Sequence, residues 1–326
     1  MSARTRDAVF DTRALERLAR VARLEPGLLV EDFAAPGARE VLADAEVLLT
    51  GWGCPPLDEA ALARMPRLRL VAHAAGTVKH HVTEAVWRRG VLVSTAAAAN
   101  ALPVAEYTVA AVLLSNKRVL DAARAFRAAR GDFGAFEALA GAGNYRRTVG
   151  IVGASRIGRR VLELLRPYDL RLLLHDPYLD PAGAAALGVE CVGLDQLCRD
   201  SDVVSIHAPE LPGNRHLFDA ARLALLRDGA TLVNTARGSL VDTAALTSEL
   251  VAGRLHAVLD VTDPEPLPAD SPLWDLPNVL LTPHVAGSLG TELARLADTA
   301  IDEIERYARG VPLAHAVRAE DLDRSA

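Results

Sequence analysis

The feature that most constrains this chain is the regular alternation of short apolar runs with helical patterns. After residue 147 the apolar runs lack polar alternation, as do parallel strands buried on both faces; they are residues 148–152, 171–175, 203–206, 231–234, 257–261 and 279–282. Helical patterns follow at 157–166, 220–227 and 242–251. The alternation predicts an α/β fold in which crossover helices join parallel strands.

The first hundred residues repeat this rhythm. The expected strands are 28–30, 47–50, 68–72 and 91–94, and the expected helices are 37–44, 57–65 and 81–89. Two longer helices, 103–119 and 291–309, flank the second series, and we expect them to connect two domains, with the tail returning to the first. The 326 residues suffice for two domains at ~150 residues each.

Charge and cysteine content exclude several classes of protein. The net charge of −6, from 36 basic and 42 acidic residues, argues against a nucleic-acid surface. The N-terminal MSARTRD has no apolar core, so we expect no signal peptide. The apolar stretch 96–114 is a poor membrane span because polar residues and a proline interrupt it: Asn100, Pro103 and Glu106. Three cysteines without metal-type spacing predict buried thiols in a cytoplasmic protein: Cys54, Cys191 and Cys198.

Residues 149–160, VGIVGASRIGRR, nearly match the dinucleotide-binding pattern G-x-G-x-x-G. Gly153 supplies a tight turn, Gly158 close helix–strand packing, and Ser155 replaces the middle glycine with a small side chain whose hydroxyl suits a phosphate oxygen. Asp176, after the next expected strand, would accept from a ribose diol and repel a 2′-phosphate, which favours NAD over NADP. The alternative is an ordinary strand–turn–helix with Asp176 as a turn residue.

Three further motifs follow expected strands: NTARG at 234–238, LDVTDPEP at 259–266 and TPHVAG at 282–287. Ligands bind outside the carboxyl ends of parallel strands, so Arg237, Glu265 and His284 are expected to converge there. An arginine holds a carboxylate bidentately, a histidine exchanges protons near neutral pH, and a carboxylate beside the imidazole orients it. The alternative for these residues is surface ion pairing and turn chemistry.

These motifs, in this order, resemble the D-isomer-specific 2-hydroxyacid dehydrogenase family, which includes phosphoglycerate dehydrogenases and hydroxypyruvate reductases. The matching stretches are 104–106, 150–158, Asp176, 201–209, 234–246, 259–266 and 278–287. The resemblance implies an α/β fold of two doubly wound parallel-sheet domains. A Rossmann NAD-binding domain, residues 101–291, would be inserted in a flavodoxin-like substrate domain made of residues 1–100 and 292–326.

The resemblance also implies an activity and the residues that perform it. Arg237 resembles the residue that binds the substrate carboxylate and keto oxygen, His284 the general acid/base, and Glu265 its partner. The implied reaction is hydride transfer between NAD(H) and C2 of a 2-hydroxy or 2-keto acid of D stereochemistry, in a homodimer packed through the cofactor domain. The implied cofactor-binding residues are Gly153, Ser155, Arg156, Ile157, Gly158, Asp176, His207, Pro209, Thr235, Ala236, Asp260, Ala286 and Gly287.

The sequence departs from the family pattern mainly in the substrate loop, 73–81, which reads HAAGTVKHH. We expect the backbone N–H groups of Ala75, Gly76 and Thr77 to hold a carboxylate there. Lys79 either adds a charge contact to a larger or doubly anionic substrate or is an ordinary solvated lysine. A metal site is not expected, because the histidines on this turn lack ligand partners with known spacing: His73, His80 and His81.

Two alternative functions remain open on the same fold. One is an NAD(H)-sensing binding protein or corepressor, and the other is a dehydrogenase of an atypical substrate such as phosphite. Formate is disfavoured because formate dehydrogenases of this scaffold have a glutamine in the place of Glu265.

Overall fold

The computed structural model describes residues 1–24, 29–130, 139 and 141–322. The chain divides into two compact units. Unit 1 comprises Met1–Ala101 and the C-terminal segment that begins at Ser288, and unit 2 comprises Leu102–Gly287. Helix α6, Ala97–Asn116, carries the chain from the first unit into the second. Each unit is described by itself below.

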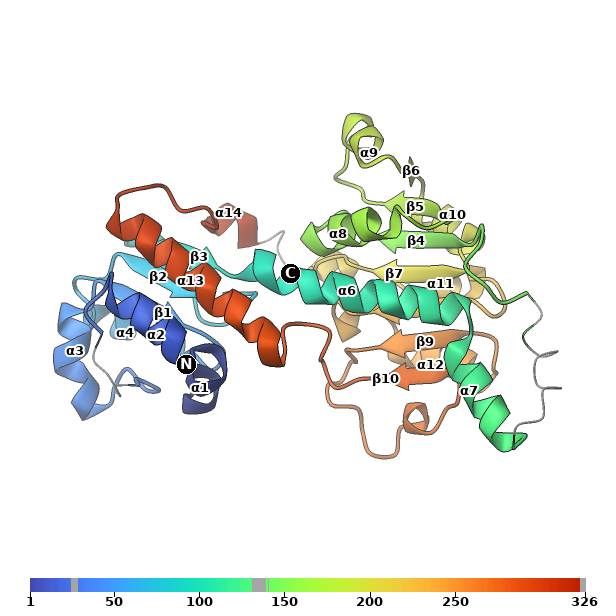
Figure 1. Ribbon diagram of the computed structural model, residues 1–326, viewed down its shortest axis with the longest axis horizontal. Helices are drawn as coiled ribbons and strands as arrows, with labels where there is room; N and C mark the ends of the chain where they lie inside the picture. Colours follow the sequence, from blue (N-terminus) through green and yellow to red (C-terminus); the bar gives the residue numbers. More distant parts are fainter. Residues whose placement is uncertain (25–28, 131–138, 140, 323–326) are drawn as a thin grey trace. The chain divides into compact units, whose positions relative to one another are not determined.

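Unit 2 is built on a parallel sheet of seven strands in the order β10-β9-β8-β7-β4-β5-β6 (Figure 1). The strands are Thr148–Val152 (β4), Arg171–His175 (β5), Glu190–Cys191 (β6), Val203–Ile206 (β7), Thr231–Asn234 (β8), His256–Leu259 (β9) and Val279–Leu281 (β10). The chain runs outward from β4 to β6 and then returns to β7 on the other side. The loops that follow β4 and β7 therefore diverge at a topological switch point, where open parallel sheets bind ligands.

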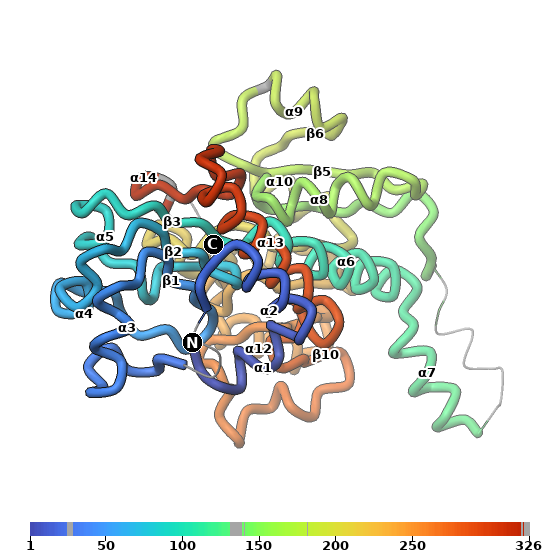
Figure 2. Tube along the Cα trace, turned by 60° about the vertical axis from the view of Figure 1, so that its left-hand side comes forward, coloured from blue at the N-terminus to red at the C-terminus, as the bar shows by residue number. Residues whose placement is uncertain are grey.

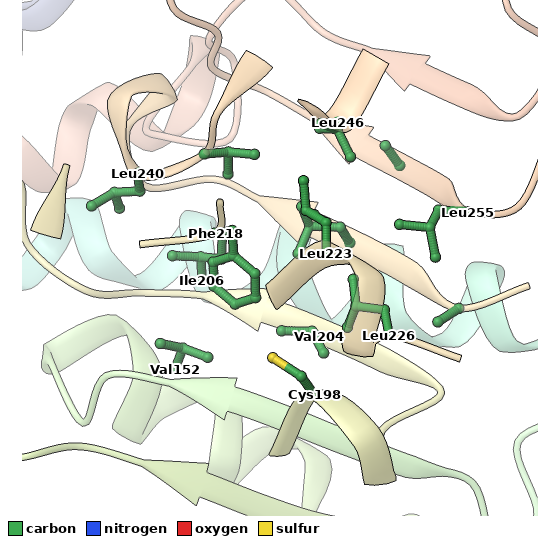
Figure 3. Close-up of a cluster of buried hydrophobic side chains, with 14 of the residues drawn as sticks. Val152, Cys198, Val204, Ile206, Phe218, Leu223, Leu226, Leu240, Leu246 and Leu255 are labelled. Atoms are coloured by element: carbon green, nitrogen blue, oxygen red, sulfur yellow. The ribbon is translucent and has the colours of Figure 1, made fainter. Parts of the chain in front are cut away.

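Helices cover both faces of this sheet because its strands are apolar on both sides. Helices α6 and α8 (Arg156–Leu165) pack with one set of strand residues, which includes Ile151 and Val233. The other face packs against α10 (Leu194–Asp200), α11 (Ala220–Leu225) and α12 (Thr243–Val251), with Phe218 fully buried among them (Figure 3). Helices α7 (Val119–Ala128) and α9 (Pro181–Leu187) complete the unit.

Unit 1 has a smaller parallel sheet in the order β1-β2-β3, formed by Val47–Thr50, Leu70–His73 and Leu92–Thr95. One face packs against α1 (Ala3–Val9), α2 (Thr12–Ala19) and α13 (Leu293–Ala308), and Figures 1 and 2 show α13 running beside the two N-terminal helices. The other face packs against α3 (Arg39–Asp44), α4 (Glu59–Ala63) and α5 (Glu84–Arg88). The segment before α14 (Ala319–Leu322) returns to β3, where the Val317 N–H donates to the Val93 carbonyl at 2.8 Å.

The predicted α/β class with parallel sheets is confirmed, and several element boundaries are wrong. Residues 29–30 of the expected strand 28–30 are not in a strand, and residue 28 lies outside the described residues. The described sheet of unit 1 thus holds three strands, fewer than the five of a flavodoxin-like order. Helix α6 begins at Ala97, so Pro103 lies inside it. The alanines at 96–99 have the highest helix propensity and extend the helix before the proline.

Helix α6 is long and apolar enough to cross a membrane by length and composition alone, with a mean hydropathy of 1.4. Half of that window is buried inside the protein, as in the core helix of a globular domain.

Candidate functional site

The loop after β4 has the geometry of a dinucleotide cradle. Gly153 has φ = 101°, and a Cβ there would lie 2.8 Å from the backbone of His207 and Ala208 on the adjacent loop. A Cβ on Gly158 would lie 2.0 Å from the Gly153 carbonyl oxygen. Neither position can hold a side chain, so both glycines are required to bring the start of α8 against the strand ends.

Ser155 is the N-cap of α8, and its Oγ accepts from the Gly158 N–H at 3.3 Å. Ser155 therefore satisfies one of the unpaired N–H groups in the first turn of α8. Its own hydroxyl proton remains available to a phosphate oxygen. Arg156 is exposed in the first turn of the helix, beside Ile157. Free backbone N–H groups and a positive helix end favour an anion at this position.

Asp176 follows β5 and faces the same loop. Its Oδ2 accepts from the Ala154 N–H at 2.6 Å and its Oδ1 from the Tyr178 N–H at 2.8 Å. The carboxylate thus fixes the loop, and each oxygen retains lone-pair capacity for a ribose hydroxyl.

His207 follows β7, and its backbone lies directly behind Gly153. Its ring is buried, with Nε2 2.9 Å from the Ser205 Oγ, and burial lowers its pKa to about 3. Nδ1 has no hydrogen-bond partner among the residues that the structure describes. The ring is therefore neutral and supports the loop from within the core, and half-buried Pro209 follows it towards the surface.

The strands β8, β9 and β10 are adjacent and in register, with Asn234 and Leu281 both aligned with Leu259. The loops that follow them therefore leave the sheet at one edge, about 5 Å apart from strand to strand. Arg237 and His284 each lie three residues beyond an aligned position. The register brings together the loops of the three candidate catalytic residues, as the motif spacing predicts.

The turn that carries Arg237 is held by the side chain of Asn234. Its Nδ2 donates to the Arg237 carbonyl at 2.8 Å, and its Oδ1 accepts from the Ala236 N–H at 3.0 Å. A Cβ on Gly238 would lie 2.0 Å from the backbone of Thr262, so the β8 and β9 loops touch. The Arg237 guanidinium donates to the Ala236 carbonyl at 2.6 Å, and no described carboxylate lies within 4.0 Å of it. It is thus available to an anionic ligand.

His284 Nδ1 lies 2.8 Å from Glu265 Oε1, and both side chains are about half exposed, at 51% and 44%. Because the carboxylate accepts, Nδ1 carries a proton and Nε2 is left to face a ligand. His284 itself adopts a left-handed conformation, with φ = 55°, which is uncommon for a residue other than glycine. Its backbone N–H donates to the Asp260 carbonyl at 2.9 Å.

Asp260 is 2% exposed and is largely engaged inside the protein. Its Oδ1 accepts from the Thr282 hydroxyl at 2.6 Å and the Val285 N–H at 2.8 Å, and its Oδ2 accepts from the Ala286 N–H at 2.9 Å. Oδ2 retains capacity for one more donor, such as a carboxamide. The remaining predicted cofactor residues lie in these same loops, with Thr235, Ala236 and Ala286 buried and Gly287 half-buried.

The predicted substrate loop lies in unit 1, beyond the carboxyl end of β2. Ala75 is buried, whereas Gly76, Thr77 and Lys79 are partly exposed. Across the described residues, no acceptor lies within hydrogen-bond distance of the Gly76 or Thr77 N–H, which leaves both donors for an anion. No group of three or more potential metal ligands occurs in the described ranges, including the histidines of this loop.

Two of those histidines pack against each other under the loop. The rings of His73 and His81 are 4.5 Å apart, His73 Nδ1 lies 2.9 Å from the Thr50 hydroxyl, and His81 Nε2 is buried without a described partner. Burial is the main cause that lowers the pKa of His73 to about 3 and that of His81 to about 4, and the neighbouring histidines lower both further.

Unit 1 is therefore expected to lose stability in acid. Since the folded pKa values lie below the unfolded value of 6.5, the unfolded chain binds more protons, and stability falls as the pH drops from about 6.5 towards 4. Each histidine would contribute roughly 1–2 kcal/mol of this loss between pH 6.5 and 5. Urea unfolding at pH 7 and pH 5 measures it. His81→Gln should shrink the difference, and His315→Gln, at a partly exposed histidine of unit 1 outside this pair, should not; equal curves for both variants would contradict the assignment.

The fold and these loops define an α/β protein with a dinucleotide-binding domain. Residues 109–286 match the family described as D-isomer specific 2-hydroxyacid dehydrogenase, NAD binding domain. The chain belongs to this family, and the recognition from sequence is confirmed.

Individual relatives agree with this assignment. The chain is 35% identical over 254 residues to the D-3-phosphoglycerate dehydrogenase of Mycobacterium tuberculosis, covering 78% of this chain and 47% of that protein. It is 33% identical over 261 residues to the glyoxylate reductase of Aeropyrum pernix, covering 78% and 77%. A phosphoglycerate oxidoreductase from Rhizobium etli has a similar structure, with a TM-score of 0.78, 25% identity and coverage of 98% and 95%. The chain spans about half the length of the phosphoglycerate dehydrogenases it matches.

Proposed function

We propose that this protein is an oxidoreductase that transfers a hydride between NAD(H) and C2 of a 2-hydroxy or 2-keto acid of D stereochemistry. The observation that carries the proposal is the 2.8 Å pair of His284 and Glu265 on the sheet edge that also carries Arg237. Unit 2 would be the Rossmann domain that binds NAD, and unit 1 the substrate domain.

Bound NAD(H) supplies the hydride donor or acceptor, and the chain's own residues orient the acid and move the proton. The Arg237 guanidinium binds the substrate carboxylate and keto oxygen with two of its parallel N–H donors. In the reductive direction, protonated His284 delivers the Nε2 proton to the substrate oxygen. Glu265 holds Nδ1 and balances the charge of the imidazolium, which keeps Nε2 pointed at that oxygen.

The substrate would also contact unit 1 through the N–H groups of Ala75, Gly76 and Thr77, with Lys79 as a further positive group. Similar proteins are named for phosphoglycerate and for glyoxylate, two acids that differ in size and charge. These names support a 2-hydroxy or 2-keto acid as the substrate class and do not select one acid. We infer a small-molecule acid as the partner and, from three free cysteines, a cytoplasmic location. The prediction that all three thiols are buried is wrong: Cys198 is buried, Cys54 is partly exposed, and Cys191 is exposed on the short strand β6.

A panel of 2-keto acids with NADH tests the proposal. Glyoxylate, hydroxypyruvate, pyruvate, 2-ketoglutarate and bulky branched or aryl acids are each followed by absorbance, and each is repeated with NADPH. Turnover of one group supports the reaction and reveals what the 73–81 loop selects. Tight NADH binding with no turnover of any acid would contradict it and favour a sensing role or an atypical substrate such as phosphite.

Asp176→Ala should narrow the preference for NADH over NADPH by about tenfold, because the charge that repels a 2′-phosphate is removed. Binding titrations with both cofactors give the ratio. Asp180→Ala, which removes the exposed N-cap carboxylate of α9, is the matched control. An unchanged ratio in Asp176→Ala would refute the role of this carboxylate.

We propose that the protein is a homodimer packed through unit 2. Helix α7 has no buried residue, and large apolar side chains are exposed along α6 and α7: Leu114, Val119, Leu120 and Phe126. Sedimentation analysis should give a dimer for the native protein and a monomer for Leu120→Glu. Val251→Glu, at an exposed apolar residue on α12, should stay dimeric. A monomeric native protein would contradict the proposal.

A further inference from the structure

A line of hydrogen bonds connects helix α6 to the loop of His284, all within unit 2. The Tyr107 hydroxyl on α6 lies 2.8 Å from Thr282 Oγ1, and Thr282 Oγ1 lies 2.6 Å from Asp260 Oδ1. The Asp260 carboxylate in turn accepts from the backbone N–H groups of Val285 and Ala286 at 2.8 and 2.9 Å. Figure 1 shows α6 lying against the sheet of unit 2. Its residues Ala105, Ala111 and Val112 are buried in the core that it shares with strand residues such as Ile151.

The donors and acceptors in this line follow once Asp260 is taken as a carboxylate. Two of its three partners are backbone N–H groups, which can only donate, and a carboxylate can only accept. Thr282 must then donate its single hydroxyl proton to Asp260, and Tyr107 must donate to Thr282. Burial, followed by the charge of Asp260, raises the pKa of Tyr107 against the opposing effect of Thr282, consistent with a tyrosine that keeps its proton.

The line ends at a residue whose backbone conformation is uncommon. His284 is in the left-handed region at φ = 55°, and such a residue persists only where its surroundings determine it. Asp260 holds four residues of this loop. Its carboxylate accepts from the Thr282 hydroxyl and from the N–H groups of the two residues after His284, and its backbone carbonyl accepts from the His284 N–H at 2.9 Å. The Asp260 network therefore determines the direction in which the His284 ring leaves the loop.

We propose that Tyr107 and Thr282 are positioning residues that act through Asp260 to hold His284 in its left-handed conformation, with Nδ1 on Glu265 and Nε2 directed at the reacting oxygen. The inference rests on the proposed acid/base function of His284. The hydroxyl groups of Tyr107 and Thr282 would thus contribute to proton transfer without contacting the substrate. Tyr107 does so from a helix that is far from β10 in sequence.

The matched variants are Thr282→Val, which removes the hydroxyl at constant size, and Thr282→Ser, which keeps it. Tyr107→Phe breaks the line one step further away, and Thr247→Val removes a hydroxyl that donates to the Thr243 carbonyl within α12 of the same unit. Thr282→Val should lower kcat about tenfold to a hundredfold while KM and NADH affinity stay within about twofold, and Tyr107→Phe should have a smaller effect of the same kind. Thr282→Ser and Thr247→Val should retain native kcat.

A second measurement does not depend on turnover. Nitrogen NMR of histidine-labelled protein resolves the His284 ring, which is identified by the loss of its signals in His284→Gln. Thr282→Val should change the chemical shifts of the two ring nitrogens, which report their hydrogen bonding, and Thr282→Ser and Thr247→Val should not. Unchanged His284 signals in Thr282→Val, or an equal loss of kcat in Thr247→Val, would overturn the inference. If the native protein turns over no acid, the proposed function fails, and the His284 chemical shifts still decide whether the line holds this residue.

Discussion

His284→Gln should lose turnover by roughly a hundredfold to ten-thousandfold, the range that removal of a general acid or base produces. Glutamine can keep a hydrogen bond to Glu265 but cannot deliver a proton near neutral pH. The loss should fall on kcat, since His284 does not contribute to the cradle formed by Gly153 and Gly158. Steady-state kinetics with the best acid and NADH fluorescence titration measure the two quantities separately.

The control is His216→Gln, which changes a partly exposed histidine of the same unit. It should leave both kcat and NADH affinity unchanged. Native turnover in His284→Gln would contradict the acid/base role. A loss of NADH binding as large as the loss of turnover would mean that the residue supports the cofactor site instead.

Arg237→Gln should lower kcat/KM by about a hundredfold or more, because two charge-assisted hydrogen bonds to the substrate are lost together. Arg237→Lys keeps the charge but not the planar pair of donors, so it should recover only part of the loss. The structure supports this expectation: Asn234 fixes the turn from both sides, and no described carboxylate competes for the guanidinium.

Kinetics across a series of substrate concentrations measure this effect, with NADH affinity as the internal reference. Arg171→Gln, which alters an exposed arginine paired with Glu190 at the start of β5, is the matched control. An Arg237→Gln protein with native kcat/KM would contradict the proposed role in substrate binding.

Much of the fold was predictable because its strands are buried on both faces. Apolar runs such as 148–152 and 203–206 coincide with β4 and β7. These strands lie in the middle of a sheet that has helices on both faces. The N-terminal helices α1 and α2 were not predicted, since short amphipathic helices acquire their stability from packing against β2 and α13. The early start of α6 was missed because a proline suggests a first turn, whereas local alanine content decides where the helix begins.

The candidate site was predictable where a motif ends a strand and not where contacts are distant in sequence. Arg237, Glu265 and His284 could be named from spacing, and register brings their loops to one edge. The engagement of Asp260 with Thr282 and the following backbone was not visible, because it depends on the conformation of a loop. Tyr107 gave no signal at all, since it lies 175 residues from its partner in an apolar helix.

The most direct test of the central claim uses NADH deuterated at C4 of the nicotinamide ring, with the best acid from the panel. Proton NMR and chiral chromatography of the product locate the deuterium and the configuration. The account predicts deuterium at C2 of a hydroxy acid that is a single D enantiomer. A product without deuterium at C2, an L product, or bound NADH that is never oxidised by any acid would contradict it.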